Sequence, residues 1–466
     1  MAKAYDATPR DNIPVETKYR KMACVFPHPE ASALIEKLRS REPVSMTGQP
    51  PVIWDRAQGI NVFDRWGNKW LDMTSCVVVA NAGHSNPQVG QAITDTVSQG
   101  LLSSYCFPND QRMKLVERIC ELSPEPLGKV FLLTTGSETT ECAIKLCRTY
   151  GLRKYGAHKI KIITFDNAFH GRTMGSQQAG GSSAGKAWIV NFDKDIVQVP
   201  FPNAFLYEWA DESRADYSDD RCFDMFLAAL REQGVQPEDI AGVMSETFQG
   251  GWVQMMPKGF VQRLRAFCDR HDILMAFDEI QAGFGRTGKL FGFQHYDVAP
   301  DLVCCGKGIS SSLPISCVIG RQDVMDLYGP AEMTSTHSGN PVCSAAALAS
   351  IDYIVENKLP EHAAKMGKIF GEGLGAIRQK YAGRIGVANS KGLVGCLITV
   401  KPGTKEPDPD LAYDVVLAAV KKGLLLFAPV GNGAAVKLCP PLIIEEEPLR
   451  EALGVLDEAF AEVFAR

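Results

Sequence analysis

Short apolar runs alternate with amphipathic stretches through the middle of the chain. Runs of this length suit strands that are buried on both faces of a sheet, and the stretches between them suit helices. The pattern predicts an α/β fold, in which a mostly parallel sheet is sandwiched by helices. The runs are VFLLT (130–134), KIITF (161–165), IAGVMSE (240–246), ILMAF (273–277), LVCC (302–305) and ISCVIG (315–320).

The pattern changes on both sides of this region. Residues 52–73 alternate apolar and polar positions around two glycine turns, which predicts a small antiparallel meander. Residues 346–466 return to mixed helices and strands. We therefore expect an N-terminal arm and meander over 1–74 that packs with the last part of the chain, a large domain over 75–345, and a smaller α+β domain over 346–466.

Charge and composition narrow the function classes. The formal net charge of −5 over 466 residues argues against nucleic-acid binding, which needs clustered Lys and Arg. No apolar window is long enough for a membrane span, and the first residues contain no secretory signal. The 14 cysteines form no CxxC pair, and no HExxH motif is present. We expect a cytoplasmic protein with reduced thiols, no metal site and no membrane partner.

In parallel sheets, ligands bind beyond the carboxyl ends of the strands, so residues that follow apolar runs are candidates. Gly136 and Ser137 open a helix whose backbone amides could bind a phosphate, or they form only a capped turn. Phe169 and Arg172 in AFHGRT could stack on a planar ring and bind a carboxylate, or only pack a loop.

Two further strand ends carry charge. Asp278, after ILMAF, could face a cationic ring nitrogen, and Lys307, after LVCC, could form a Schiff base with a carbonyl. An ion pair and a snorkelling lysine are the plain alternatives. A phosphate cradle, a stacking aromatic, a carboxylate and a lysine together match the requirements of pyridoxal 5'-phosphate. GFGRTG also fits GxGxxG, but no clear helix opens behind it, which disfavours a nucleotide site.

These stretches resemble the class III pyridoxal-phosphate aminotransferases, the ω-amino acid aminotransferase group of fold type I. The resemblance runs from about 50 to 460 through GSETTECAIK, FHGRT, MAFDEIQAGFGRTGKL, APDLVCCGKGISSS and SGNPVCSAAALA. It implies that Lys307 forms the Schiff base and moves the proton, and that Asp278 pairs with the pyridine nitrogen. It also implies the remaining cofactor positions: Ile280 and Phe169 on the two ring faces, Gln281 at the phenolic oxygen, Gly136 and Ser137 at the phosphate, and Thr336 at the phosphate of a neighbouring subunit.

The substrate positions follow the resemblance less closely. Arg172 matches an arginine that binds a distal carboxylate, and Val77 resembles an apolar pocket position. Glu246 resembles a glutamate that pairs with a switching arginine, but Lys437 stands where that arginine is expected. Thr247 also replaces the usual proline. Lysine cannot form the bidentate fork to a carboxylate. Either Lys437 still supplies a charge, or the substrate differs: an amine, a β-amino acid or a bulkier amino compound.

The resemblance implies a ping-pong aminotransferase that moves an amino group from an ω-amino acid or related amine to a 2-oxo acid. It implies a homodimer with shared active sites and leaves a tetramer open. An amino acid racemase or epimerase is the main alternative, because GSQQAGGSS and TKEPD also resemble the branched-chain epimerase branch. Arg172 fits the aminotransferase branch better, and no residue identifies the second acid that racemisation needs. A phospholyase is a third option. A cofactor-free relative is disfavoured, because every cofactor position is intact.

Overall fold

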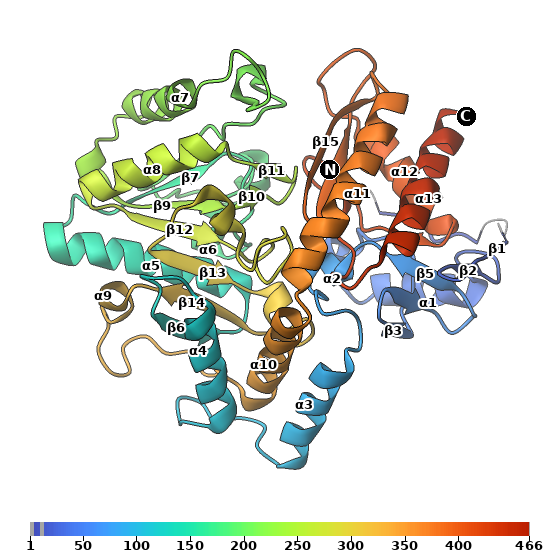
Figure 1. The fold of residues 1–466 in the computed structure, drawn as a ribbon, viewed down its shortest axis with the longest axis horizontal. Helices are drawn as coiled ribbons and strands as arrows, with labels where there is room; N and C mark the ends of the chain where they lie inside the picture. The colour runs from blue at the N-terminus through green and yellow to red at the C-terminus, as the bar shows by residue number, and fades with distance from the viewer. Residues whose placement is uncertain (1–3, 10–13, 466) are drawn as a thin grey trace.

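A computed structural model describes residues 4–9 and 14–465, and its centre is a seven-stranded sheet (Figure 1). The strand order is β6-β14-β13-β12-β9-β7-β8. All neighbouring strands are parallel except β14, which is antiparallel to both β13 and β6. The predicted mostly parallel sheet is therefore confirmed. The strands are β6 (Lys129–Leu133), β7 (Lys161–Phe165), β8 (Ile196–Val199), β9 (Ile240–Glu246), β12 (Leu274–Asp278), β13 (Leu302–Cys305) and β14 (Ser316–Gly320).

Helices cover both faces of this sheet, as the continuous apolar runs predict. In β12, Leu274 and Ala276 pack in the cluster that includes α5 (Gly136–Tyr155), whereas Met275 and Phe277 pack with α7 (Asp219–Glu232) and α8 (Lys258–His271). The alternation follows from the two-residue period of a strand. It explains why the run contains no polar position before Asp278. Two short helices, α6 (Met174–Ala179) and α9 (Gln322–Met325), border the α5 face.

Three helices form a separate layer at the lower edge of the molecule in Figure 1. Helix α10 (Pro341–Glu356) packs against both α3 (Pro87–Ser98) and α4 (Asp110–Leu122). Asn340 caps α10, since its side chain accepts hydrogen bonds from the amides of Val342 and Cys343. This cap fixes the start of the helix that follows the loop containing Thr336.

A second sheet joins the beginning of the chain to its last quarter. The predicted meander is present as antiparallel β3, β4 and β5, and β5 continues in parallel with β17. Helix α1 (Pro29–Arg39) lies beside this sheet (Figure 1). The strands are β1 (Val15–Glu16), β2 (Lys21–Met22), β3 (Arg56–Gln58), β4 (Asn61–Phe63), β5 (Lys69–Asp72) and β17 (Leu424–Leu425).

The C-terminal part contains a three-stranded antiparallel sheet in the order β15-β16-β18. Helices α11, α12 and α13 pack around it and around one another. The boundaries at residues 74 and 345 remain a prediction. The elements are α11 (Leu359–Lys380), β15 (Ile385–Lys391), β16 (Val394–Thr399), α12 (Pro409–Lys421), β18 (Ala435–Leu438) and α13 (Glu446–Phe464).

The remaining short elements border the strand ends. All 14 cysteines are free, and most of them are buried in the core. Within residues 4–9 and 14–465, no helix combines the length and the apolar character needed to cross a bilayer. The short elements used below are α2 (Ser75–Val78), β10 (Phe248–Gln249), β11 (Gln254–Met255), and the 3-10 helices η5 (Gly292–Tyr296) and η6 (Lys307–Ile309).

Candidate active site

Three neighbouring strands of the central sheet end close to the charged residues that the sequence singles out. β9 ends at Glu246 and β12 ends at Asp278, and these two residues are paired in register. Asp278 is also paired with Cys304 of β13, and Lys307 follows shortly after that strand. Because parallel strands bring their carboxyl ends to the same edge, Glu246, Asp278 and Lys307 lie together there.

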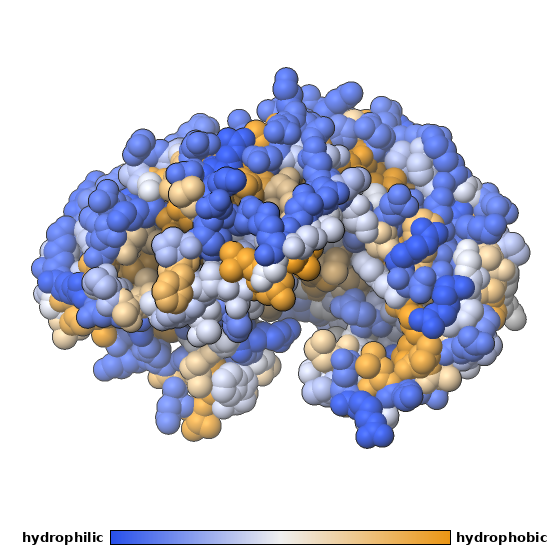
Figure 2. All heavy atoms as spheres, turned by 90° about the horizontal axis from the view of Figure 1, so that it is seen from below, coloured by the Kyte–Doolittle hydropathy of each residue, from blue (hydrophilic) through white to orange (hydrophobic). Residues whose placement is uncertain are grey.

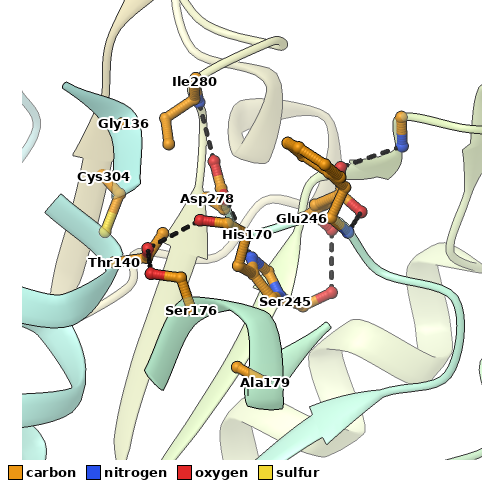
Figure 3. Close-up of polar contacts among 12 residues, drawn as sticks. Gly136, Thr140, His170, Ser176, Ala179, Ser245, Glu246, Asp278, Ile280 and Cys304 are labelled. Atoms are coloured by element: carbon orange, nitrogen blue, oxygen red, sulfur yellow. Dashed lines mark hydrogen bonds and ion pairs between the residues drawn. The ribbon is translucent and has the colours of Figure 1, made fainter. Parts of the chain in front are cut away.

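Asp278 is buried and both of its oxygens are engaged (Figure 3). Oδ1 accepts a hydrogen bond from the Ile280 amide at 3.0 Å, and Oδ2 lies 2.9 Å from His170 Nδ1. A carboxylate only accepts, so Nδ1 carries a proton and donates it. Burial lowers the pKa of His170, but the hydrogen bond and the charge of Asp278 outweigh burial and bring the pKa above its ordinary value. This pair favours the protonated form of His170.

Glu246 is buried beside this pair and is held by the backbone. Its Oε2 accepts from the Phe169 amide at 2.9 Å, and its Oε1 accepts from the Gly250 amide at 3.0 Å. Burial raises the pKa of Glu246 to about 7, against the opposing effect of His170. Within the described part of the chain, Glu246 forms no ion pair with Lys437. The carboxylate is therefore bound to amides rather than to the nearby lysine.

Lys307 presents an amine that no side chain or carbonyl oxygen of the described residues binds. It starts η6 with a φ of 46°, a left-handed conformation that is uncommon for a residue with a side chain. Among the described residues, none accepts a hydrogen bond from its Nζ. Burial lowers the pKa of the amine; Asp278 opposes this effect and Lys437 adds to it. A lysine of this kind is neutral more often than a surface lysine, and a neutral amine is a nucleophile.

The start of α5 differs in detail from the plain alternative offered by the sequence, in which Ser137 caps the helix. Thr135 is the N-cap, and its hydroxyl accepts from the Glu138 amide at 3.4 Å while Glu138 Oε2 accepts from the Thr135 amide at 2.8 Å. This reciprocal capping box leaves the Ser137 hydroxyl free of the capping role. Gly136 and Ser137 thus stand in the first turn of a 20-residue helix, where backbone amides attract anions.

These strand ends and the start of α5 enclose a cavity of about 170 Å³. Two glycines keep its walls bare: a Cβ on Gly136 would lie 2.7 Å from Ile280 Cδ1, and a Cβ on Gly171 would collide with Ser137 Oγ. An anion-binding helix start, a buried carboxylate bonded to His170, apolar walls and an unbonded amine suit a phosphorylated aldehyde with a basic ring, as in pyridoxal phosphate. The lining residues are Thr135, Gly136, Ser137, Phe169, His170, Gly171, Asp278, Ile280, Gln281 and Lys307.

Lys437 is buried at the rim of this site on β18. Its Nζ donates to Gln281 Oε1 and to the Gly250 carbonyl oxygen, each at 2.7 Å, and lies 5.5 Å from the Phe248 ring centroid. An ammonium has three N–H donors. The third donor has no acceptor in the part of the chain that the structure describes, and no carboxylate there forms an ion pair with Lys437. A buried cation that lacks a counter-ion suits the binding of an anion.

Five of the residues singled out in the sequence do not line the cavity: Glu246 and Lys437 are buried beside it, and the other three lie at the surface. Val77 is 46% exposed on α2, and Thr336 is exposed in the loop between α9 and α10. Arg172 is exposed, with its guanidinium carbon 5.5 Å from the centroid of the Phe169 ring. The structure therefore gathers the cofactor candidates of one chain, and it leaves these three side chains on the surface around them.

The family of the chain follows from a comparison with protein-family models. The model of the aminotransferase class-III family matches residues 44–460, which is most of the chain. The chain belongs to the class III aminotransferases. Its fold is thus that of fold type I, and the cofactor of this class III aminotransferase is pyridoxal phosphate.

The relatives of this class III aminotransferase are named for two kinds of activity, amino-group transfer and epimerisation. The chain is 32% identical to a probable 4-aminobutyrate aminotransferase of Bacillus subtilis, covering 86% of this chain and 91% of that one. It is 34% identical to an isoleucine 2-epimerase of Lentilactobacillus buchneri, covering 88% and 90%. A Bacillus anthracis aminotransferase structure superposes with a TM-score of 0.84 at 27% identity, covering 93% and 99%.

Sequence reasoning gave no partner to His170 and no role to Gly250. His170 follows the end of β7, and this position is the sequence signal from which a contact with Asp278 could have been predicted. Gly250 offers its amide to Glu246 and its carbonyl oxygen to Lys437, and a Cβ there would collide with Gln281. No local motif marks such a glycine, because the Lys437 contact comes from a residue 187 positions away in the chain.

Proposed function

We propose that this class III aminotransferase transfers an amino group from an ω-amino acid or related amine to a 2-oxo acid by a ping-pong reaction through Lys307. The observation that carries the proposal is the Lys307 amine: it faces the cavity, lies beside Asp278, and has no hydrogen-bond acceptor among the described residues. Relatives named as 4-aminobutyrate and 5-aminovalerate aminotransferases support ω-amino acids as donors.

When bound, pyridoxal phosphate supplies a reactive aldehyde and an electron-accepting ring. Asp278 would hold the proton on the ring nitrogen, and the His170 Nδ1–H would orient the Asp278 carboxylate for this task. Ile280 and Phe169 would pack on the two ring faces, and Gln281 would reach the phenolic oxygen. The amides of Gly136 and Ser137 would bind the phosphate together with Thr336 of a neighbouring subunit.

In the first half-reaction, the Lys307 Nζ would take the proton from the amine-bearing carbon of the donor and deliver it to the cofactor. In the second half-reaction, the same amine would move a proton in the reverse direction, to the carbon of the acceptor that receives the amino group. Its lowered pKa supports this role, because a proton carrier works best when both of its protonation states are accessible near neutral pH. Burial of the amine also excludes bulk water, which would compete for the proton.

The charges at the rim favour substrates that carry a carboxylate. Lys437 would bind the α-carboxylate of the 2-oxo acid through its third N–H donor, as a single-point contact. Arg172, which is exposed beside Phe169, would bind a second, distal carboxylate. The buried position of Lys437 without a counter-ion supports the simpler of the two alternatives, that Lys437 still supplies a charge.

A homodimer with shared sites is part of the proposal. The loop and helix ends between α3 and α4 expose many apolar side chains, with Phe107 73% exposed. Figure 2 views the face on which α3 and α4 lie, and it shows apolar side chains gathered near the middle of that face. Such a patch suits burial against a second subunit. The exposed apolar residues there are Val97, Leu101, Leu102, Tyr105, Phe107 and Met113.

Two measurements test the proposed function. Loading with pyridoxal phosphate, borohydride reduction and peptide mapping should label Lys307; buried Lys186, whose amine is bonded to Gln178 and Gly180 carbonyls, is the internal control and should stay unlabelled. A donor screen without acceptor should then release about one oxo product per subunit, as a ping-pong reaction requires. A label elsewhere, or no oxo product from any donor, contradicts the proposal.

Epimerisation is the second candidate, because the isoleucine 2-epimerase relative is as similar as the aminotransferases. Under this alternative, a good substrate exchanges its α-hydrogen with solvent deuterium and changes configuration without releasing an oxo product. The same screen, run in deuterium oxide with chiral analysis of the amino acid, separates the two reactions.

A further inference from the structure

A second cavity lies where three distant segments of the chain meet. Its volume is about 310 Å³, and the described residues that line it all differ from those that line the cavity around Asp278. Its walls are the loop after β12, helix α11 and the turn between β15 and β16, together with η5. A cavity of this size can hold a small-molecule ligand.

Three glycines bring the three segments into close contact. A Cβ on Gly392 would lie 2.5 Å from the carbonyl carbon of Thr287, and a Cβ on Gly367 would lie 2.7 Å from Gly392 Cα. A Cβ on Gly288 would lie 3.0 Å from Ala364 Cβ. Gly288 and Gly392 also have left-handed φ angles of 92° and 55°, which favour glycine. The close spacing of the three backbones therefore depends on residues that lack a side chain.

Each of these three glycines has a lysine beside it in the chain, and the lysines are Lys289, Lys368 and Lys391. All three lysines line the cavity. Among the described residues, none accepts a hydrogen bond from these amines or forms an ion pair with them. The described lining also contains no aspartate and no glutamate. The contact of the three backbones thus gathers three ammonium groups around one space without a counter-ion.

The positive charge of the cavity affects the groups around it. Burial lowers the pKa of Lys391; Glu212 opposes this effect and Lys289 adds to it. Burial also lowers the pKa of His295, which lines the cavity, and Lys391 and Lys289 lower it further, to about 4. Glu212 lies outside the lining, and its Oε1 accepts from the Lys258 amide at 2.9 Å. Like charges that are held together repel one another, and a bound anion would relieve this repulsion.

The kind of donor indicates which anion fits the cavity. No arginine is present in the described lining, so the planar two-point contact that suits a carboxylate is not offered there. Three ammonium groups on three separate segments suit a tetrahedral group instead, because its oxygens point in different directions. A phosphate group has this shape, carries up to two negative charges and presents three strong acceptor oxygens.

We propose that this cavity is a binding site for a small phosphate-bearing anion, and that Lys289, Lys368 and Lys391 are its ligands. The site is independent of the proposed function. Two of its segments continue into the active site, because the loop after β12 contains Gln281 and β16 pairs with β18 at Lys437. A bound anion would therefore join the supports of the active site without contacting the substrate.

Titration calorimetry of the holoenzyme with inorganic pyrophosphate, without divalent cations, tests the proposal. The cofactor keeps pyrophosphate out of the phosphate site at the start of α5. We expect one pyrophosphate to bind per subunit and to raise the Tm by about 2–4 °C at about 100 times its Kd. Ionic strength is held constant with chloride, because screening alone also changes the Tm.

Lys391→Met removes a charge and keeps the apolar stem of a partly buried side chain. We expect it to raise the Kd for pyrophosphate about 10-fold or more, as for a lost charge-assisted hydrogen bond. Its Tm without pyrophosphate should equal or exceed that of the wild type, because the repulsion from Lys289 is relieved. Lys368→Met, at an exposed position, is the second variant and should weaken binding in the same direction.

Two control variants separate this cavity from other cationic positions. Lys365 is exposed on the same helix as Lys368 but does not line the cavity, so Lys365→Met should leave the Kd within about 2-fold. Lys437→Met should also leave the Kd as it is, because Lys437 lies at the rim of the active site.

Three results overturn the proposal. The first is a holoenzyme that neither binds pyrophosphate nor gains Tm from it. The second is binding that Lys437→Met or Lys365→Met weakens as much as Lys391→Met does, which would place the anion elsewhere. The third is citrate that binds as tightly as pyrophosphate at the same ionic strength, which would show that the cavity does not select phosphate.

Discussion

Two regions of the molecule bury charge in opposite ways. The first region, called the seam below, is the fully buried Arg286 together with the residues that it joins from distant parts of the chain, Asn81, Leu393 and Pro440. Its Nη1 donates to the carbonyl oxygens of Leu393 and Pro440, and its Nη2 donates to Asn81 Oδ1 at 2.7 Å. Burial lowers its pKa to about 10. The two terminal nitrogens thus meet protein acceptors, and only Nε is buried without a partner among the described residues.

The second region is the cavity around Asp278, and its polar groups are left incomplete. His170 Nε2 is buried without a partner among the residues of the structure that are described. Lys307 Nζ has no acceptor there, and one donor of Lys437 is unused. Buried polar groups are almost always paired in native proteins, so unpaired ones in a cluster need an explanation. A ligand that completes them is the direct explanation.

This difference in hydrogen bonding distinguishes residues that stabilise the fold from residues that are positioned to bind a ligand. Burial and charge alone do not distinguish Arg286 from Lys437, since both are buried cations without an ion pair to a described carboxylate. Each also keeps one donor without a described acceptor, Nε of Arg286 and one N–H of Lys437, but only Lys437 bonds a residue that lines the candidate cavity. The predictions below test this criterion by changing one side chain in either region.

Replacement of Lys307 by alanine should have the largest effect. We expect kcat to fall by roughly 10⁴-fold or more, because the nucleophile and the proton carrier are removed together. The Tm of the apoprotein should hardly change, because the amine makes no hydrogen bond that would be lost. Rate measurements on the holoenzyme and thermal unfolding without cofactor check the two parts. A large loss of Tm would place Lys307 with the seam residues instead.

Replacement of Arg286 by methionine should show the opposite profile. Leaving several buried acceptors without donors should lower the free energy of unfolding by about 3–5 kcal/mol. Thermal unfolding of the purified protein measures this loss. Arg286→Lys is the matched control and should recover only part of it, because one ammonium cannot reach all the acceptors. An Arg286→Met variant of normal Tm and low kcat would break the distinction between the two regions.

Replacement of Lys437 by methionine should act on substrate rather than on the fold. We expect KM for a 2-oxo acid to rise roughly 10- to 100-fold, as for a lost charge-assisted hydrogen bond. An amine donor without a carboxylate should keep its KM. Lys437→Arg should retain oxo-acid binding. Steady-state kinetics with both substrates varied measures these constants, and an unchanged KM for the oxo acid would contradict the role of the third donor.

The pH dependence of stability should differ in sign between the two regions, as the smallest effect. The pKa of His170 is raised, so its stabilising contribution is complete below about pH 6.5 and is lost as pH rises through the native pKa. Burial lowers the pKa of His295, near the seam, to about 4, so stability there rises between about pH 4 and 6.5.

His170→Gln should flatten the fall in stability above neutral pH, and His295→Gln should flatten the rise on the acid side. Tm values measured across pH 4–9, with differences on the order of 1–2 °C, check both slopes. Equal slopes for the two variants would show that Asp278 does not favour the protonated form of His170.

The sequence predicts the parts of this structure that depend on local pattern. Asp278 and Lys307 lie after strands that the apolar runs indicate, because a doubly covered strand must be continuously apolar until it leaves the core. The direction of β14 was not predictable, since an apolar run reads the same in a parallel and an antiparallel pairing.

The contacts that complete the site depend on distant segments. Lys437 meets Gln281 across 156 residues, and no periodicity within β18 indicates that its lysine points inward. The left-handed run at Ser75–Val78 gives no signal at all, because it lacks the glycine that normally marks such backbone. Tertiary hydrogen bonds impose that conformation, and these are visible only in the folded chain.

The bond from Ser75 to Cys439 has a consequence for biosynthesis. The two residues are separated by 364 positions, so the left-handed turn lacks this hydrogen bond until most of the chain has been synthesised. At about 5–20 residues per second, that interval is roughly 20–70 s. During this time β5 also lacks β17 and exposes an open edge, which is a known site of aggregation. We therefore expect nascent chains to depend on chaperones over this interval, and the turn after β5 to be among the last parts of the chain to reach its final conformation.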